Sequence, residues 1–197
     1  MSFKYFNQYE NVPRYTKKGF EVVKCPEDIG GVILDLYSML LQFPEEEELI
    51  KSDKIQNHSK FLDFSRFMGI TKHIHNYLLP LHEQWSNQIL EPIAIWGIRS
   101  YTEGSVLKNH NDRPLTHHIS SIIMVDKDLN NEDDWALDIQ DHDGEWHKIY
   151  TEPGDMILYE SVSCMHGRSI PFKGNFFRNF YMHYKVRDLN YIGVDIN

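Results

Sequence analysis

Hydrophobic and polar positions follow two different periods along the chain, and the change lies near residue 92. Before it, apolar side chains recur at helical spacing. Pro26, Glu27 and Asp28 have the character of a helix start. The apolar positions that follow at helical spacing are Ile29, Val32, Ile33, Leu36, Leu40 and Leu41. A second helix is predicted from Ile70 to about Ile89, kinked or split by Pro80. Residues 1–91 are therefore predicted to form a mostly helical support region.

After Pro92 the pattern is typical of short strands joined by tight turns. The segments rich in β-branched and aromatic residues are 93–101, 117–125, 135–139, 147–150, 156–160 and 176–184. Asp143-Gly144 is a hairpin signal, and Pro153-Gly154-Asp155 marks a further turn. About seven or eight such strands predict a small β-barrel or jelly roll, supported by helices and wide enough inside for one small ligand. We expect a single domain over residues 1–197, with residues 92–186 as its β core and 187–197 as a tail.

Composition places the chain among ordinary globular proteins, with 41% hydrophobic, 13% aromatic and 25% charged residues. The formal net charge of −9 argues against a general phosphate-binding surface, so no nucleic-acid partner is expected. Cys25 and Cys164 are too few for a disulfide framework. The chain lacks an apolar signal core and a run of about 20 apolar residues. We therefore expect a soluble, cytoplasmic protein with no membrane partner.

The chemistry of the chain is concentrated in His110-Asn111-Asp112 and in a distant histidine, His166. Side chains two residues apart on a strand point to the same side of the sheet. A third ligand from another strand would complete a face of two imidazoles and one carboxylate, which holds Fe(II) and leaves positions open for O2 and an organic cosubstrate. His-x-Asp alone is a weak signal. The order of the neighbouring residues makes the signal stronger. Tyr101 precedes His110-Asn111-Asp112, and Arg178 follows the distal histidine, His166.

In this arrangement the chain resembles the 2-oxoglutarate/Fe(II)-dependent dioxygenases, and among them the prolyl 4-hydroxylase-like branch. The matching segments are Tyr101-Thr102-Glu103-Gly104, Leu107, His110-Asn111-Asp112, Pro153-Gly154-Asp155, Tyr159-Glu160, His166-Gly167-Arg168 and Gly174. The resemblance covers roughly residues 92 to 186 and implies a mainly β fold, a double-stranded β-helix (cupin-like jelly roll) buttressed by N-terminal helices. It also implies His110, Asp112 and His166 as iron ligands, and Tyr101 as a hydroxyl donor to the C5 carboxylate of 2-oxoglutarate.

The family needs a cation for the same carboxylate, usually Lys or Arg on the penultimate or last strand of the barrel. Here the chain departs from the prolyl hydroxylase pattern, because Phe176 stands where that branch often carries Lys. Arg178 would face the same side of the strand as Phe176, and a guanidinium there can bind a carboxylate with two hydrogen bonds. Arg168, two residues after His166, is the competitor. Strand geometry leads us to favour Arg178 slightly.

Arg99 is a further cation of this region. Its spacing puts it on the same face as Tyr101. Its partner is therefore either the cosubstrate or Glu160, and the sequence leaves both open.

Most of the 11 histidines are expected to play no part in the chemistry. His117 and His118 are adjacent, so only one of them can face the barrel interior, where a contact to a ligand side chain or to substrate is the natural role. His183 is expected to be a structural histidine near the end of the last strand. His73 and His75 are expected at partly exposed positions on a helix, and His142 and His147 are expected in solvent beside a hairpin.

The function expected is an Fe(II)- and 2-oxoglutarate-dependent oxygenase that uses O2 to hydroxylate a C–H bond and releases succinate and CO2. The resemblance suggests a proline-like or peptidyl substrate, or another small molecule. A cupin-like sensor that binds metal or 2-oxoglutarate without turnover is one alternative. A cupin metalloenzyme that does not use 2-oxoglutarate is another, and succinate production distinguishes the three. The acidic segment 130–134 is expected to be a solvated loop, with a lid that favours basic peptides as the alternative. Oligomeric state does not follow from the pattern.

Overall fold

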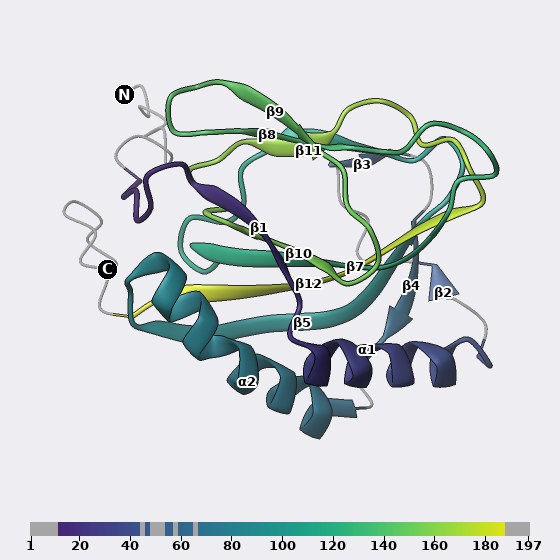
Figure 1. The fold of residues 1–197 in the computed structure, drawn as a ribbon, viewed down its shortest axis with the longest axis horizontal. Coiled ribbons are helices and arrows are strands. Elements are labelled where there is room, and N and C mark those ends of the chain that lie inside the picture. Colours follow the sequence, from purple (N-terminus) through teal and green to yellow (C-terminus); the bar gives the residue numbers. More distant parts are fainter. Residues whose placement is uncertain (1–11, 44–45, 48–53, 57–58, 65–66, 188–197) are drawn as a thin grey trace, which may run out of the picture.

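The computed structural model describes residues 12–43, 46–47, 54–56, 59–64 and 67–187, which form two antiparallel sheets with helices beneath one of them (Figure 1). The larger sheet contains β1 (Phe20–Lys24), β2 (Glu46–Glu47), β4 (Ser59–Asp63), β5 (Leu90–Tyr101), β7 (Ile119–Asp128), β10 (Asp155–Tyr159) and β12 (Phe176–Val186). The smaller sheet contains β3 (Ile55–Gln56), β6 (Val106–His110), β8 (Leu137–Gln140), β9 (Trp146–Ile149) and β11 (His166–Arg168). Their orders are β1-β10-β7-β12-β5-β4-β2 and β3-β6-β11-β8-β9.

From β5 onward the chain winds between the two sheets. It passes from β5 to β6, back to β7, across to the β8–β9 hairpin, back to β10, across to β11 and back to β12. This winding is that of a double-stranded β-helix, so the predicted jelly-roll fold is confirmed. The predicted hairpin turn is also present, with Gly144 at a positive φ of 87° between β8 and β9.

The two helices, α1 (Glu27–Leu40) and α2 (Met68–Ser86), cover the outer face of the larger sheet (Figure 1). The apolar side of α1, which includes Ile29, Ile33 and Leu36, packs in one core with Leu78 of α2 and Phe180 of β12. Burial of such a stripe supplies most of the stability of an amphipathic helix. The helix starts are those predicted to within two residues, and Pro80 lies inside α2 without splitting it. In the described part of the chain, no helix is both long and apolar enough to cross a membrane.

The N-terminal region is less helical than predicted, because it also supplies strands to both sheets. β1 pairs with β10, and β4 pairs with β5, so the larger sheet is extended at both edges. β3 pairs with β6 at the edge of the smaller sheet. These strands are short, which is why no period could be recognised in the sequence. The predicted tail lies outside the described residues from residue 188 onward.

Candidate metal centre

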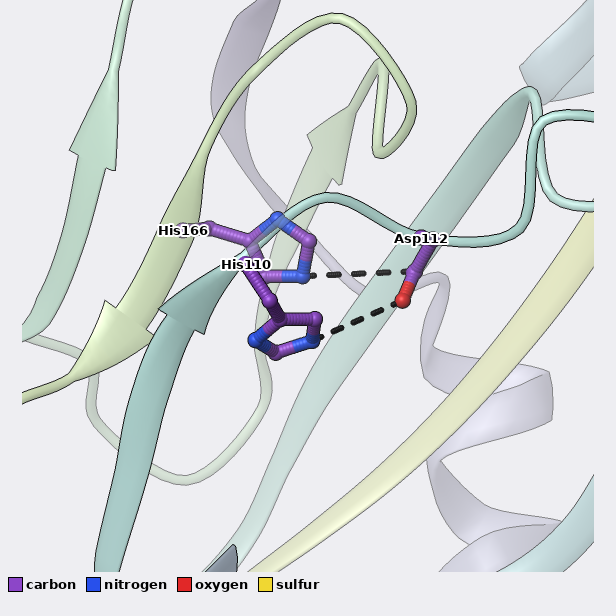
Figure 2. Close-up of side chains that lie close together, drawn as sticks. All are labelled: His110, Asp112 and His166. Atoms are coloured by element: carbon purple, nitrogen blue, oxygen red, sulfur yellow. Dashed lines mark ion pairs between the residues drawn. The ribbon is translucent and has the colours of Figure 1, made fainter. Parts of the chain in front are cut away.

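The two predicted histidine ligands face each other across the smaller sheet. β6 ends at His110, β11 begins at His166, and the two residues are direct register partners. Asp112 follows two residues after β6, where its backbone N–H donates to the carbonyl oxygen of Ser161 at 2.8 Å. The three side chains converge on one point (Figure 2). Nε2 of His110 lies 3.5 Å from Oδ1 of Asp112, and Nε2 of His166 lies 3.9 Å from Oδ2.

Backbone carbonyls fix the orientation of both imidazoles. Nδ1 of His110 lies 2.7 Å from the carbonyl oxygen of Lys108, and Nδ1 of His166 lies 3.0 Å from that of Cys164. A carbonyl only accepts hydrogen bonds, so each Nδ1 carries the proton and each Nε2 presents its lone pair toward Asp112. This is the arrangement in which histidines usually bind a metal.

The protonation states of Asp112 and His166 also suit the binding of a metal cation. Burial opposes the ionisation of Asp112, but the contact with His110 and the fields of the neighbouring imidazoles outweigh it and hold the pKa of Asp112 well below its usual range. Burial lowers the pKa of His166 to about 4. At neutral pH the site therefore offers an ionised carboxylate and a neutral imidazole. Two nitrogen donors and one oxygen donor fit Fe(II) with positions left open, so the residues present suit the predicted metal.

Three residues beside the triad were not among the predicted site residues. Nδ1 of His183 lies 3.9 Å from Oδ2 of Asp112 and 2.7 Å from Oγ of Ser120, so this residue is both hydrogen-bonded and next to the centre. His117 stacks on His183 with the ring centroids 4.0 Å apart. The ring of Tyr159 meets that of His166 edge-on at 4.8 Å. Only one of the two adjacent histidines faces the centre, as predicted. It is His117, whereas His118 hydrogen-bonds to the backbone of Pro114 and Val186.

Arg168 lies buried between the two sheets. Its side chain is 1% exposed, and its Cζ stands 4.9 Å from the ring centroid of Trp135 and 4.5 Å from that of Phe177. One terminal nitrogen donates to the carbonyl oxygen of Trp135, whereas Nη2 is buried without a hydrogen-bond partner. Tyr101 packs edge-on against the same Trp135 at 5.0 Å, which puts the predicted hydroxyl donor in the same compartment. Among the described residues, no carboxylate lies within 4.0 Å of this guanidinium.

Arg178, the arginine that we favoured slightly from the sequence, faces away from this compartment in the structure. Its guanidinium donates to the hydroxyl of Tyr37 on α1 and, through Nε, to Oγ of Ser100 at 3.2 Å. It also lies 4.0 Å from Asp126 and covers the ring of Phe176 at 3.8 Å. Phe176 and Arg178 do share a side of the strand, as predicted, but that side packs against the helices. Arg178 is therefore not positioned to reach a ligand held by the triad.

Arg99 lies between two tyrosine rings. Its Cζ lies 4.6 Å from the ring centroid of Tyr181 and 6.0 Å from that of Tyr101, with which it shares a face as predicted. The alternative partner, Glu160, is engaged elsewhere. Its carboxylate accepts hydrogen bonds from the backbone N–H groups of Tyr15 and Thr16 at 2.9 and 2.7 Å and holds the N-terminal segment in place.

Three histidines are less exposed than expected: His75 and His142 are buried, and His147 is half-buried. His75 contacts the carbonyl oxygen of His183 at 3.3 Å, and His142 lies 3.4 Å from Glu160. His147 contacts Asp141 at 2.6 Å. Asp141 and His147, with Glu145, form a second group of side chains close enough together to hold a cation, but Glu145 is exposed and the aspartate already accepts backbone hydrogen bonds of its own hairpin.

Comparisons with known proteins agree on the fold. No family model matches the chain, and no curated protein matches its sequence. Among solved structures, the non-heme α-ketoglutarate-dependent epimerase SnoN from nogalamycin biosynthesis is similar with a TM-score of 0.65 and 12% identity, over 92% of this chain and 89% of that one. HygX from Streptomyces hygroscopicus, solved with nickel and 2-oxoglutarate bound, gives 0.62 and 13%, over 87% and 84%. A Pseudomonas putida prolyl 4-hydroxylase gives 0.59 and 12%, over 86% and 94%.

These likenesses extend over nearly the full length of both partners, so the chain has the fold of the 2-oxoglutarate/Fe(II) oxygenases. They cover enzymes with different reactions, and fold alone does not choose among reactions. The chemistry has to be argued from the side chains of this site.

Proposed function

We propose that this protein is an Fe(II)- and 2-oxoglutarate-dependent oxygenase that hydroxylates a C–H bond. One observation carries the proposal. A metal-binding face with both imidazoles correctly oriented lies in the same interior as a buried arginine, Arg168, whose Nη2 has no partner. The first feature suits a metal with open positions, and the second suits the distal carboxylate of a dicarboxylic cosubstrate.

The metal would be held by Nε2 of His110, Nε2 of His166 and the carboxylate of Asp112. With 2-oxoglutarate and O2, bound Fe(II) would supply the oxidative decarboxylation, in which one oxygen atom enters succinate, CO2 leaves and the other oxygen atom is available to oxidise a substrate C–H bond. The chain contributes the geometry. The Lys108 and Cys164 carbonyls hold the two rings, and the neighbouring His183 and Tyr159 close the centre on the side of the larger sheet.

Arg168 is our candidate for the cosubstrate anchor. Burial lowers its pKa to about 10, partly offset by Tyr101 and two aspartates, so the guanidinium remains charged at neutral pH. A buried charge with no carboxylate in direct contact is unfavourable, and an anion bound in the same compartment would stabilise it. A carboxylate beside Nη2 would form a charge-assisted hydrogen bond, with the Tyr101 hydroxyl as a second donor. Trp135 and Phe177, which flank the guanidinium, exclude water and strengthen such a contact.

The substrate we propose is a proline-like compound, a peptide or another small molecule. Support comes from the likeness in fold to a prolyl 4-hydroxylase and from the motif segments around the triad. No nucleic-acid substrate is proposed, because the formal net charge of the chain is −9.

The experiment that tests the function measures succinate release by anaerobically purified protein supplied with Fe(II), 2-oxoglutarate and O2, beside His110→Ala. Turnover without substrate releases some succinate in such enzymes, so no substrate has to be known. We expect release by the wild type and loss in the variant. Calorimetry of 2-oxoglutarate binding to Ni(II)-loaded protein accompanies the assay. Binding without succinate would point to a sensor, and the absence of both would point to a cupin metalloenzyme that does not use 2-oxoglutarate.

A further inference from the structure

We infer that the substrate of this centre carries an anionic group, a carboxylate or a phosphate, which binds to a basic rim above the triad. The rim consists of Lys54 and of Arg113, which directly follows Asp112 in the chain and is exposed. The inference rests on the proposed function and adds the chemical class of the substrate to it. Neither residue belongs to the motif that the sequence shares with the oxygenases.

Lys54 is brought to the triad by the N-terminal half of the chain. β3 begins one residue after it and pairs with β6, and the Lys54 carbonyl oxygen accepts a hydrogen bond from the backbone N–H of Lys108 at 2.8 Å. Its ammonium lies 3.2 Å from the carbonyl oxygen of Asn111 and 3.8 Å from Oδ1 of Asp112. The lysine is thus fixed at both its backbone and its side chain, next to a metal ligand.

Exposure of the side chains shows which end of the site is open. It rises from 3% at His166 to 12% at Asp112, 14% at His110 and 35% at Lys54. Lys54 therefore stands at the mouth, where a substrate enters, whereas Arg168 is in the buried interior. The difference in burial assigns different roles to the two cations: Arg168 binds the cosubstrate, and Lys54 binds the substrate.

Two cations act on the mouth of the site, although the formal net charge of the chain is −9. Burial is the main cause that lowers the pKa of His117, and Arg113 and Lys54 add to it against the opposing charge of Asp112. A divalent metal bound to Asp112 would add further positive charge beside Lys54. An acidic protein with net charge −9 would then present a local positive potential at its catalytic mouth. Such a focused field favours and steers an anionic substrate.

The acidic segment 130–134 does not supply the opposite preference. Its Asp134 forms an ion pair with Lys127 at 2.8 Å and also accepts a hydrogen bond from its own neighbour Trp135. The same lysine contacts Glu152 at 3.1 Å. Asp134 is thus partly neutralised by Lys127, so we do not expect it to attract a basic peptide to the metal.

The test uses full-length protein loaded with Ni(II), which does not turn over, and saturated with 2-oxoglutarate. Inorganic phosphate, acetate, neutral acetamide and cationic methylammonium are titrated by calorimetry at low and high salt. The proteins are the wild type, Lys54→Gln, Arg113→Gln, the double variant and Lys54→Arg. Lys173→Gln serves as the matched control, since Lys173 is 71% exposed and forms only a surface ion pair with Glu132.

We expect the wild type to bind phosphate or acetate and neither of the other probes, with an affinity that falls about tenfold in the double variant, as for a rim that acts through charge. Lys54→Arg should retain most of the binding, and Lys173→Gln all of it. Whichever of the two anions binds more tightly identifies the substrate group. Anion binding that is absent in the wild type, or equal in the wild type and the double variant, overturns the inference.

Two further outcomes separate this inference from the proposed function. Loss of 2-oxoglutarate binding in Lys54→Gln would assign the lysine to the cosubstrate, and the inference would be wrong while the oxygenase stands. Failure of the wild type to bind 2-oxoglutarate would contradict the proposed function. The anion titration on metal-loaded protein would then still report on the rim by itself.

Discussion

The guanidinium of Arg168 lies 4.5 Å from the ring centroid of Phe177, so a cation from β11 covers an aromatic residue of β12 that faces it across the barrel. The next residue on β12, Arg178, points to the opposite face and binds the Tyr37 hydroxyl of α1. Two arginines near the end of the chain thus serve two different layers of the fold. One stands in the interior beside the triad, and the other joins the sheet to a helix.

This division predicts different effects of removing the two side chains. Arg168→Ala should weaken 2-oxoglutarate binding to Ni(II)-loaded protein by a factor on the order of 100, because a buried charged hydrogen bond is lost. Arg178→Ala should leave that affinity within about twofold and lower the free energy of unfolding by about 1–2 kcal/mol through its lost hydrogen bonds. Calorimetry and urea unfolding measure the two quantities. An unchanged affinity in Arg168→Ala, with loss in Arg178→Ala, would reverse our assignment.

Metal binding should stabilise the protein through the triad and not through the acidic hairpin at Asp141. A ligand that binds only the folded state at about 100 times its dissociation constant adds about 2.7 kcal/mol to the free energy of unfolding. We expect Mn(II) or anaerobic Fe(II) to raise the melting temperature of the wild type and to have no such effect on His166→Ala. His147→Ala, which removes a member of the second cluster, is the matched control and should respond as the wild type does. If the metal raised the melting temperature of His166→Ala but not that of His147→Ala, the metal would be located on the hairpin.

Buried neutral histidines make the fold sensitive to acid. His82 is fully buried, with Nδ1 donating to the carbonyl oxygen of Leu78 at 2.8 Å and Nε2 accepting from Oγ of Ser121 at 2.9 Å. Burial lowers its pKa from 6.5 to about 4. Below pH 6.5 the unfolded chain binds a proton that the folded chain does not, so stability is present above that pH and is lost as the pH falls toward 4. At about 1.36 kcal/mol per pKa unit, the loss from this one residue is about 3 kcal/mol.

The acid sensitivity is measured as the free energy of unfolding in urea between pH 7 and pH 4.5. His82→Gln should start lower at pH 7 but show a smaller decrease toward acid than the wild type. His73→Gln, on the exposed side of the same helix, should leave the decrease unchanged. Equal slopes in His82→Gln and the wild type would show that other groups dominate the acid response.

Gly97 permits the close approach of β5 to β4. Its φ is 150°, and a Cβ built there would stand 2.0 Å from the carbonyl oxygen of Leu62, which is backbone and cannot move aside. Gly97→Ala should therefore lower the free energy of unfolding by about 3 kcal/mol or more. The control is Gly31→Ala, where nothing lies within 4 Å of the new atom and the helix should gain about 0.5–1 kcal/mol. Denaturant titration compares the two, and a tolerated alanine at position 97 would show that β4 can separate from β5.

The sequence was sufficient for the relations that depend on a short stretch of chain. Period-2 spacing correctly put Phe176 and Arg178 on a common side of their strand. It could not say which side of β12 faces the barrel. That choice depends on a shift of register at Arg178 and Asn179 against β7 and on the packing of α1, which are both long-range features.

Burial of single polar residues escaped prediction for the same reason. His75 was expected near the surface of its helix, but the backbone of β12, more than a hundred residues later, supplies its partner. β11 is only three residues long, so its strand character cannot be read from a pattern, although it carries both His166 and Arg168. The three candidate ligands could be named because His110 and Asp112 lie two residues apart and His166 belongs to a short motif of its own. The surroundings of the triad depend on long-range packing and could not be predicted.

The pairing of β1 with β10 has a consequence for how the protein is made. Phe20 is the register partner of Tyr159, so β1 leaves the ribosome long before its neighbour exists. Until β10 is synthesised, the backbone N–H and C=O groups of residues 20–24 have no partner strand and hydrogen-bond to water or contact chaperones. Since β10 also carries Tyr159 against His166, completion of this late pairing and assembly of the metal centre are expected to be parts of one folding step.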